Sequence, residues 1–294
     1  MSIIDTPWNT TSKLAALAAN GVTTIIRYYN FSNSQRLPEK RLSLAEAQAI
    51  SAQGMTIAVV FQQGQSGAAD FTEIKGYEAG RRAYRYALND IGQPAGSGIY
   101  FSVDFDASPS QIKNAVSPFF QGIQRAFDEV SGGQPIYRVG VYGSGATAAA
   151  LTRAKLASLV WLAMSRGFRG TREALEKGNY HLEQRAPEAV LCGLGVDYDY
   201  ANPANPDFGA FTLAVEDEAA SVAPGARRCK VIARNGLRLR EGPGTNFDVV
   251  AGLQSGQIVY ALPVNAEWSS VDVEGDGLID GFAASAYLKP VDGG

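Results

Sequence analysis

The chain has only one histidine, His181, and two cysteines, Cys192 and Cys229, among its 294 residues. Two cysteines form at most one bridge, so a disulfide framework is excluded, and the pairing of Cys192 with Cys229 stays open. A single histidine excludes a zinc site built from several histidines. It also excludes most Ser-His-Asp catalysis, unless His181 is itself the base. We therefore expect no resident metal and no cofactor.

Basic charge and long apolar runs are also scarce. The net charge is −3, with 26 Lys and Arg against 29 Asp and Glu, which predicts no nucleic-acid partner. No apolar run reaches the length of a membrane-spanning helix. The opening stretch, MSIIDTPWNTT, has no basic start followed by an apolar segment, so no secretory signal is visible. These features predict a globular chain made in the cytoplasm.

The first 212 residues alternate short β-type runs with helical patterns. The predicted strands cover residues 2–5, 24–29, 56–62, 98–106, 137–142, 159–164, 180–184 and 194–199. Helices are predicted at 12–20, 43–53, 71–91, 109–130, 145–157 and 171–177. This alternation predicts an α/β fold, a (β/α)8 TIM-like barrel over residues 1–212. A doubly wound open sheet is the alternative that the same alternation permits.

The sequence changes character after residue 212. Residues 213–228 hold an acidic run at 216–218 and Ala-Pro-Gly at 223–225, which predicts a linker. Residues 229–291 show short apolar runs separated by glycine turns, a pattern typical of a small all-β domain. The chain is therefore predicted to hold two domains.

Aspartates gather where predicted strands end. Asp104 and Asp106 lie two residues apart, so we expect both carboxylates on one face, because a strand repeats its facing every second residue. Asp197 and Asp199 repeat this pattern on the eighth strand, and Asp5 ends the first. Barrel enzymes carry their chemistry at the C-terminal ends of the strands. Repulsion among these carboxylates in a partly desolvated mouth is expected to raise at least one pKa.

The C-terminal domain carries a glycine-rich turn, GLRLREGPGT, at residues 236–245. Gly256-Gln257 opens a following strand, Trp268 supplies an aromatic residue, and Gly281-Phe282-Ala283 comes before a final Tyr287-Leu288. This stretch resembles bacterial SH3 domains, which usually have Gly-Trp-Val at the third of these positions. The resemblance implies an SH3-like barrel that binds the peptide parts of the bacterial cell wall. A spacer or dimer contact is the alternative role.

The first domain carries short motifs at seven predicted strand ends. They are Ile4-Asp5, Ile26-Arg27-Tyr28-Tyr29, Val103-Asp104-Phe105-Asp106, Val141-Tyr142, Trp161-Leu162-Ala163, Glu183-Gln184 and Val196-Asp197-Tyr198-Asp199. Together they resemble glycoside-hydrolase-like barrels once classed as a domain of unknown function, and more distantly the family 25 lysozymes. The lysozymes carry Asp-x-Glu on strand four, with the glutamate as proton donor, whereas this chain has Asp104-Phe105-Asp106.

The resemblance implies a peptidoglycan-directed glycoside hydrolase of the muramidase or lysozyme type, with its acidic residues at the barrel mouth. Asp106 is the predicted general acid, and Asp5 or Asp197 is the predicted ionised carboxylate. The predicted catalytic residues are Asp106, Asp104, Asp5 and Asp197, and the predicted substrate-binding residues are Arg27, Tyr29, Gln62, Tyr142, Trp161, Gln184 and Asp199.

Other interpretations stay open. The aspartate at position 106 also fits a non-catalytic wall-binding or glycan-binding protein that kept the cleft. Two Asp-x-Asp pairs would suit Mg²⁺ or Ca²⁺, although no phosphate-binding loop accompanies them. A wall-directed chain would act at the cell envelope, after export or lysis, on peptidoglycan or another polysaccharide. A secreted toxin would also need an immunity protein, and no residue indicates one.

Overall fold

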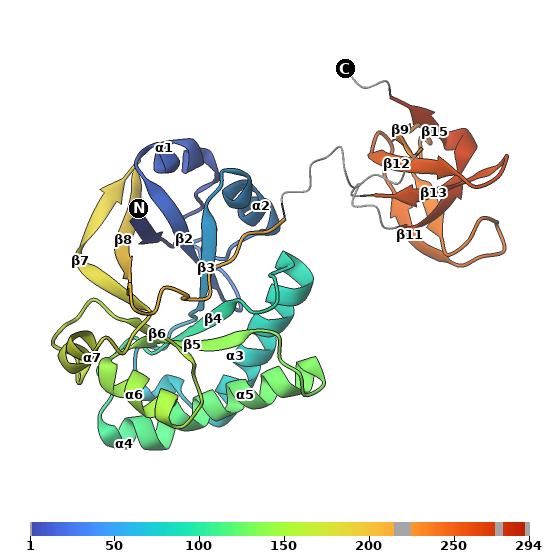
Figure 1. Ribbon diagram of the computed structural model, residues 1–294. Helices are drawn as coiled ribbons and strands as arrows, with labels where there is room; N and C mark the ends of the chain where they lie inside the picture. Colours follow the sequence, from blue (N-terminus) through green and yellow to red (C-terminus); the bar gives the residue numbers. More distant parts are fainter. Residues whose placement is uncertain (1, 215–224, 274–278, 292–294) are drawn as a thin grey trace. The chain divides into compact units, whose positions relative to one another are not determined.

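The structure is a computed structural model that describes residues 2–214, 225–273 and 279–291 (Figure 1). The chain divides into two compact units, residues 1–214 and 215–294. Of the predicted linker at 213–228, residues 215–224 lie outside the described residues. The two units are described separately below.

The first unit is a closed barrel whose strands neighbour one another in chain order. The strands are β1 (Ser2–Asp5), β2 (Val22–Tyr29), β3 (Thr56–Phe61), β4 (Gly98–Ser102), β5 (Arg138–Gly143), β6 (Leu159–Leu162), β7 (Leu182–Leu191) and β8 (Leu194–Ala201). Each pair from β1–β2 to β6–β7 is parallel. The predicted barrel with helices is confirmed, and its closure excludes the open sheet.

The last strand departs from the predicted (β/α)8 pattern. β8 runs antiparallel to both β7 and β1. Only Cys192 and Gly193 lie between β7 and β8, both with positive φ, of 53° and 83°. A parallel neighbour would need a crossover of a dozen or more residues, so two residues can only form a hairpin. The predicted (β/α)8 barrel therefore ends in a hairpin, and its eighth strand is antiparallel to both neighbours.

Helices cover the outside of the barrel between successive strands (Figure 1). They are α1 (Leu14–Ala19), α2 (Leu44–Ala52), α3 (Glu73–Arg85), α4 (Pro109–Gln111), α5 (Ser117–Ser131), α6 (Gly145–Arg153) and α7 (Thr171–Lys177). A π-helical turn, Tyr86–Ile91, extends α3, and another, Ile112–Val116, joins α4 to α5. Ser108 caps α4 through a capping box with Gln111, as the sequence Ser-Pro-Ser-Gln predicts.

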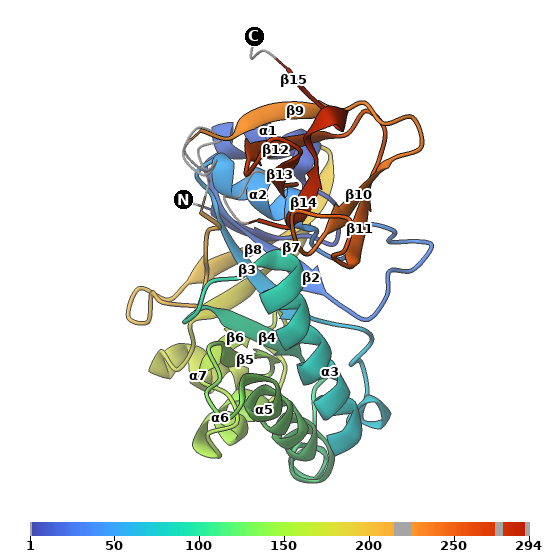
Figure 2. The same cartoon turned by 90° about the vertical axis from the view of Figure 1, so that its right-hand side faces the viewer.

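Helices α3 and α5 lie side by side in unusually close contact (Figure 2). Glycines make this approach possible: a Cβ atom on Gly76 would overlap the carbonyl of Phe119, and one on Gly122 would overlap the carbonyl of Glu73. Further along the pair, a Cβ on Gly80 would lie 2.9 Å from the Cα of Ile123. The packing of these two helices therefore depends on the absence of side chains.

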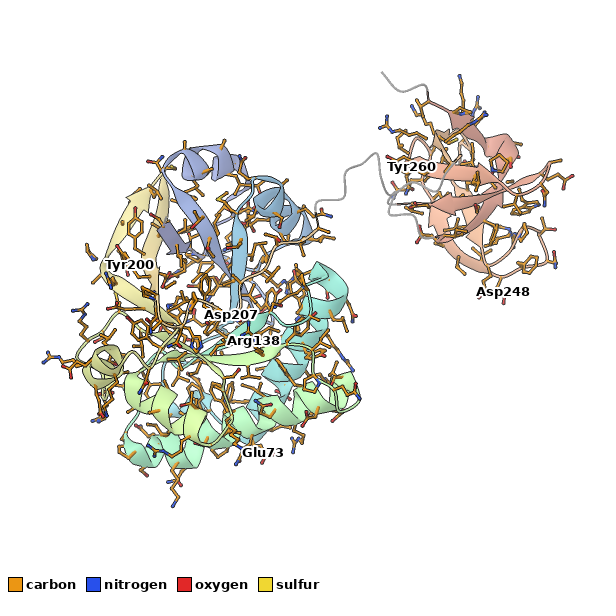
Figure 3. All side chains as sticks on the ribbon, in the orientation of Figure 1. Glu73, Arg138, Tyr200, Asp207, Asp248 and Tyr260 are labelled. Carbon is orange, nitrogen blue, oxygen red and sulfur yellow. The ribbon has the colours of Figure 1, made fainter. Side chains whose placement is uncertain are left out.

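The N-terminal end of the barrel is covered by the segment that follows β8. Gly209 accepts from the amide of Gly98 at 2.9 Å, and Phe211 accepts from the amide of Ile57 at 2.7 Å. Arg138 forms a two-pronged ion pair with Asp207, at 3.0 and 2.8 Å, and both residues are labelled in Figure 3. The C-terminal ends of β1 to β7 form the opposite end, called the mouth below.

The second unit is an all-β sheet, in the order β11-β10-β14-β13-β12-β9-β15. Its strands are β9 (Arg227–Val231), β10 (Leu237–Arg240), β11 (Val249–Leu253), β12 (Ile258–Pro263), β13 (Trp268–Asp272), β14 (Gly281–Ala284) and β15 (Leu288–Pro290). Val259, Val271 and Ala283 are fully buried at its core. The small all-β domain is confirmed. Among the helices of the described residues, none combines the length and hydropathy needed to cross a membrane.

Candidate active site

A hollow of about 290 Å³ opens at the mouth of the barrel. Its walls come from seven of the barrel strands, β2 to β8, and from the loops that follow three of them. The lining residues are Tyr28, Val60, Gln62, Ser102, Asp104, Tyr142, Trp161, Met164, Gln184, Glu188 and Asp197. The strand alternation explains this set, since Tyr28, Val60, Tyr142 and Trp161 share the interior face with the small apolar cluster that fills the barrel. The hollow therefore has an apolar floor and a polar rim.

Two carboxylates of this region share one amide group. The Nε2 atom of Gln184 donates to Oδ2 of Asp5 at 2.7 Å and to Oδ2 of Asp197 at 3.1 Å. Tyr142 donates its hydroxyl to Oε1 of Gln184 at 2.7 Å, which fixes the amide so that its nitrogen faces the acids. Asp5 and Asp197 are also register partners across β1 and β8. Directly opposed like charges are destabilising, so this arrangement has a cost in folding free energy.

Asp199 lies deeper in the barrel than Asp197. Because β8 is antiparallel, chain positions after Asp197 run away from the mouth, and Asp199 pairs with Ile3 rather than with Asp5. Its Oδ1 accepts from the indole nitrogen of Trp161 at 2.7 Å, whereas its buried Oδ2 accepts from no donor among the described residues. The prediction that Asp197 and Asp199 both lie at the mouth is therefore wrong, because β8 runs from the mouth into the barrel.

Burial and mutual repulsion shift the protonation of this cluster. Burial, and then the charge of Asp197, raise the pKa of Asp5 from 3.8 to about 7. Burial, and then the charge of Glu188, raise the pKa of Asp197 to about 6. Burial, and then Asp5, raise the pKa of Asp199 well above its usual value. The cluster therefore holds protons near neutral pH, as the sequence predicts for at least one of its members.

Asp104 lies on the other side of the hollow, since β4 and β8 are four strands apart in a closed ring of eight. Gln62 is 3.4 Å from Oδ2 of Asp104, and the Lys40 ammonium donates to Oε1 of Gln62 at 3.0 Å. Partial burial raises the pKa of Asp104, and the charge of Lys40 opposes part of that rise. The hollow thus has proton-holding acids on one wall and a carboxyl beside a cation on the other.

Arg27 and Tyr29 do not face the mouth, and the prediction that they do is wrong. In β2 the side chains of Ile26 and Tyr28 point into the barrel, whereas the prediction placed Arg27 and Tyr29 there. A shift of one residue turns every side chain of a strand to the other side. Arg27 is instead fully buried against Glu46 of α2, with nitrogen–oxygen distances of 2.9 and 3.1 Å. Tyr29 is buried outside the barrel and donates to Gln93 at 2.9 Å.

Asp106 is also absent from the lining of the hollow. β4 ends at Ser102, so the alternation that places Ser102 and Asp104 inward does not extend to Asp106. Arg169 holds Asp106 through its side chain, at 2.8 Å, and through its backbone amide, at 2.8 Å. The prediction that Asp104 and Asp106 share one face is wrong, because the chain leaves the strand before reaching Asp106.

Two residues of the site were missed by the sequence reasoning. Tyr28 donates to Oδ1 of Asp5 at 2.9 Å and lines the hollow. Glu188 lines it from an extension of β7 that continues beyond the predicted end at Gln184 to Leu191. Within the described ranges, no group of three His, Cys, Asp or Glu side chains is placed to hold a metal ion.

The chain was compared with known protein families. The family described as "Rv2525c-like, glycoside hydrolase-like domain" matches residues 15–189. The bacterial SH3 domain family matches residues 235–289. The uncharacterized protein YbfG of Bacillus subtilis is 30% identical over 202 residues, which cover 65% of this chain and 27% of YbfG. The chain thus spans about a quarter of the length of this relative.

Solved structures share the barrel fold. The Tat-secreted protein Rv2525c of Mycobacterium tuberculosis, in a crystal structure with L-tartrate, is 24% identical, with a TM-score of 0.58 over 71% of this chain and 98% of that one. An uncharacterized protein of B. stearothermophilus is 16% identical, with a TM-score of 0.51 over 72% of this chain and all of its own length.

Proposed function

Because this chain belongs to the Rv2525c-like, glycoside hydrolase-like family and carries a bacterial SH3 domain, we propose that it hydrolyses a glycan of the bacterial cell wall in the manner of a muramidase. The observation that carries the proposal is the placement of two carboxyl groups, Asp197 and Asp104, on opposite walls of one hollow. Glycosidic cleavage needs one protonated and one ionised carboxyl group.

Asp197 is the proposed general acid. It lines the hollow, and its pKa of about 6 keeps a proton available near neutral pH. Asp104, on the opposite wall, is the proposed ionised partner that stabilises the oxocarbenium-like charge or orients water. Burial raises the pKa of Asp104, and the charge of Lys40 and the hydrogen bond from Gln62 oppose that rise. Burial, and then the nearby charge of Glu188, favour the protonated form of Asp197.

Other lining residues would contact the sugar. Gln62 offers an amide to sugar hydroxyls, and the rings of Tyr142 and Trp161 form the inner wall of the hollow. Aromatic rings suit the apolar faces of sugars. Because the Gln184 amide is oriented by Tyr142, its role is to hold the two carboxylates in place.

The SH3 domain is the proposed wall-binding module. A groove of about 500 Å³ on this domain is lined by three arginines, Arg234, Arg238 and Arg240, together with Trp268 and Tyr287. Guanidinium groups recognise carboxylates through paired hydrogen bonds, and wall peptides carry carboxylates. A weak wall-binding module would raise the local concentration of the barrel at a polymer with many sites. The proposed place of action is accordingly the cell envelope.

The Asp197→Asn variant tests the hydrolase. Purified wall glycan is incubated with the parent protein and the variant, and new reducing ends are measured. Loss of a general acid is expected to reduce the rate by about 100-fold or more. Asp106→Asn is the matched control, because Asp106 lies outside the hollow, in an ion pair with Arg169, and should retain activity. Equal rates for the parent and Asp197→Asn would refute the assignment.

Glycan binding without cleavage is the second candidate. It is favoured by Asp106, which stands at the sequence position of the lysozyme proton donor. Arg169 holds this carboxylate outside the hollow. The same preparations separate the two functions. Sedimentation with wall fragments, without new reducing ends from the parent at any pH, would support binding alone.

A further inference from the structure

A second hollow of about 480 Å³ adjoins the first at the mouth of the barrel. The two hollows share three lining residues, Tyr28, Glu188 and Asp197. Its outer walls are Pro7 and Trp8, which follow β1, and Ala189 and Val190, which belong to the β7–β8 hairpin. A ligand that occupies both hollows must therefore pass over the carboxyl group of Asp197.

Trp8 presents a large exposed surface on a fixed backbone. Its side chain is 41% exposed. The backbone amide of Trp8 donates to the hydroxyl of Thr6 at 3.3 Å, and that hydroxyl donates to the carbonyl of Gly195 on β8 at 2.7 Å. The carbonyl of Thr6, in turn, accepts from the buried Arg27 at 2.6 Å. An exposed indole on anchored backbone loses little conformational entropy when a ligand covers it.

The charge of the two hollows limits what they accept. Their described lining residues include four acids, Asp5, Asp104, Glu188 and Asp197, and neither lysine nor arginine. Lys40 compensates this charge from behind Gln62, on the side of the first hollow. Those of the four carboxyl groups that are ionised repel anionic sugars and leave neutral ones unaffected. The apolar face of a neutral sugar ring is suited to stacking on an indole.

We propose that Trp8 forms a second sugar-binding subsite, so that the mouth holds a glycan chain with uncharged sugar units on both sides of Asp197. The proposal deepens the proposed function and rests on it for the position of the scissile bond. A chain bound on both sides of the acid is cut internally, so the products would be oligomers rather than single sugars released from an end. Trp8 thereby contributes to substrate length specificity.

The test measures binding of N-acetylglucosamine oligomers to the full chain carrying Asp197→Asn, which prevents turnover. Affinities for the disaccharide, tetrasaccharide and hexasaccharide are obtained from tryptophan fluorescence and calorimetry. Adding Trp8→Ala is expected to weaken binding of the hexasaccharide roughly tenfold and binding of the disaccharide less. Trp8→Phe, which keeps an aromatic platform, is expected to retain most of the affinity. Tyr200→Ala is the matched control, because Tyr200 is an aromatic residue of similar exposure, 45%, that lines neither hollow.

Each outcome bears on one proposal. The second subsite is overturned if adding Trp8→Ala leaves the hexasaccharide affinity unchanged. It is also overturned if the Asp197→Asn protein with Trp8 intact binds no oligomer. Hydrolysis by the wild type together with unchanged product lengths in Trp8→Ala overturns the subsite while the hydrolase stands. Binding that depends on Trp8, with no reducing ends from the wild type, overturns the hydrolase while the subsite stands.

Discussion

The buried carboxyl group of Asp5 should make the barrel less stable at neutral pH than at acidic pH. Asp5 is 2% exposed, and its pKa rises from 3.8 to about 7 on folding. Between these pH values the native state holds a proton that the unfolded state has released. The free energy of unfolding therefore falls as the pH rises through this window. A rise of the Asp5 pKa from 3.8 to about 7, at about 1.4 kcal/mol per pH unit, lowers the free energy of unfolding by about 4 kcal/mol above pH 7.

The substitution Asp5→Asn removes this penalty and keeps the shape of the side chain. Asp5 accepts hydrogen bonds from Tyr28 at 2.9 Å and from Gln184 at 2.7 Å. Asparagine has a single acceptor oxygen, so one of the two is lost, at a cost of about 1 kcal/mol. We therefore expect Asp5→Asn to be more stable than the wild type by about 2–3 kcal/mol well above pH 7, and less stable by about 1 kcal/mol near pH 4.

Urea unfolding of the full chain at several pH values measures the effect. Fluorescence of Trp161, which is buried beside the cluster, reports the barrel. Asp106→Asn is the control, because a half-exposed ion pair is worth about 1 kcal/mol or less and should give no crossing of the two stability curves. If Asp5→Asn is destabilised as much at pH 8 as near pH 4, Asp5 is an ordinary ionised aspartate and the reasoning is refuted.

Two further substitutions test the architecture that supports the site. Glu46→Gln leaves the buried Arg27 without its counter-charge and should cost about 3–5 kcal/mol in urea unfolding, whereas a cost below about 1 kcal/mol would contradict a buried ion pair. Gly122→Ala places a methyl group against the Glu73 carbonyl and should cost about 1–3 kcal/mol in the same assay, although alanine favours helices. Gly67→Ala, which meets no atom within 4 Å, is its control and should change stability little; equal effects of the two would contradict the close helix contact.

The cluster of buried acids around the Gln184 amide lowers the stability of the barrel while it serves the proposed hydrolysis. Gln184 donates to two carboxylates, but its two hydrogen bonds do not remove their repulsion. A site of this kind persists only because the surrounding barrel is stable enough to carry its cost. Substitutions that stabilise the mouth are therefore expected to reduce the proposed hydrolysis.

The sequence alone determined which segments form the barrel strands and which residues alternate along them. In β3 and β4 the alternation also predicts the interior face, and Gln62 and Asp104 line the hollow. The apolar residues of β2 permit either face, because strands inside a helix-covered barrel are apolar on both sides. The sequence therefore does not decide whether Arg27 or Tyr28 points into the barrel. In the structure, the buried ion pair with Glu46 of α2 keeps Arg27 on the outside.

Tertiary structure also decided where each strand stops and in which direction it runs. Asp106 is held outside the hollow by an ion pair with Arg169, which lies 63 residues further along the chain. A pattern of neighbouring residues cannot predict a partner at that distance in sequence. The two-residue turn at Cys192 and Gly193 reverses β8, which places Asp197 at the mouth and Asp199 below it. Local periodicity reports the facing of neighbours within one strand, whereas the convergence of Asp5, Gln184 and Asp197 depends on closure of the ring.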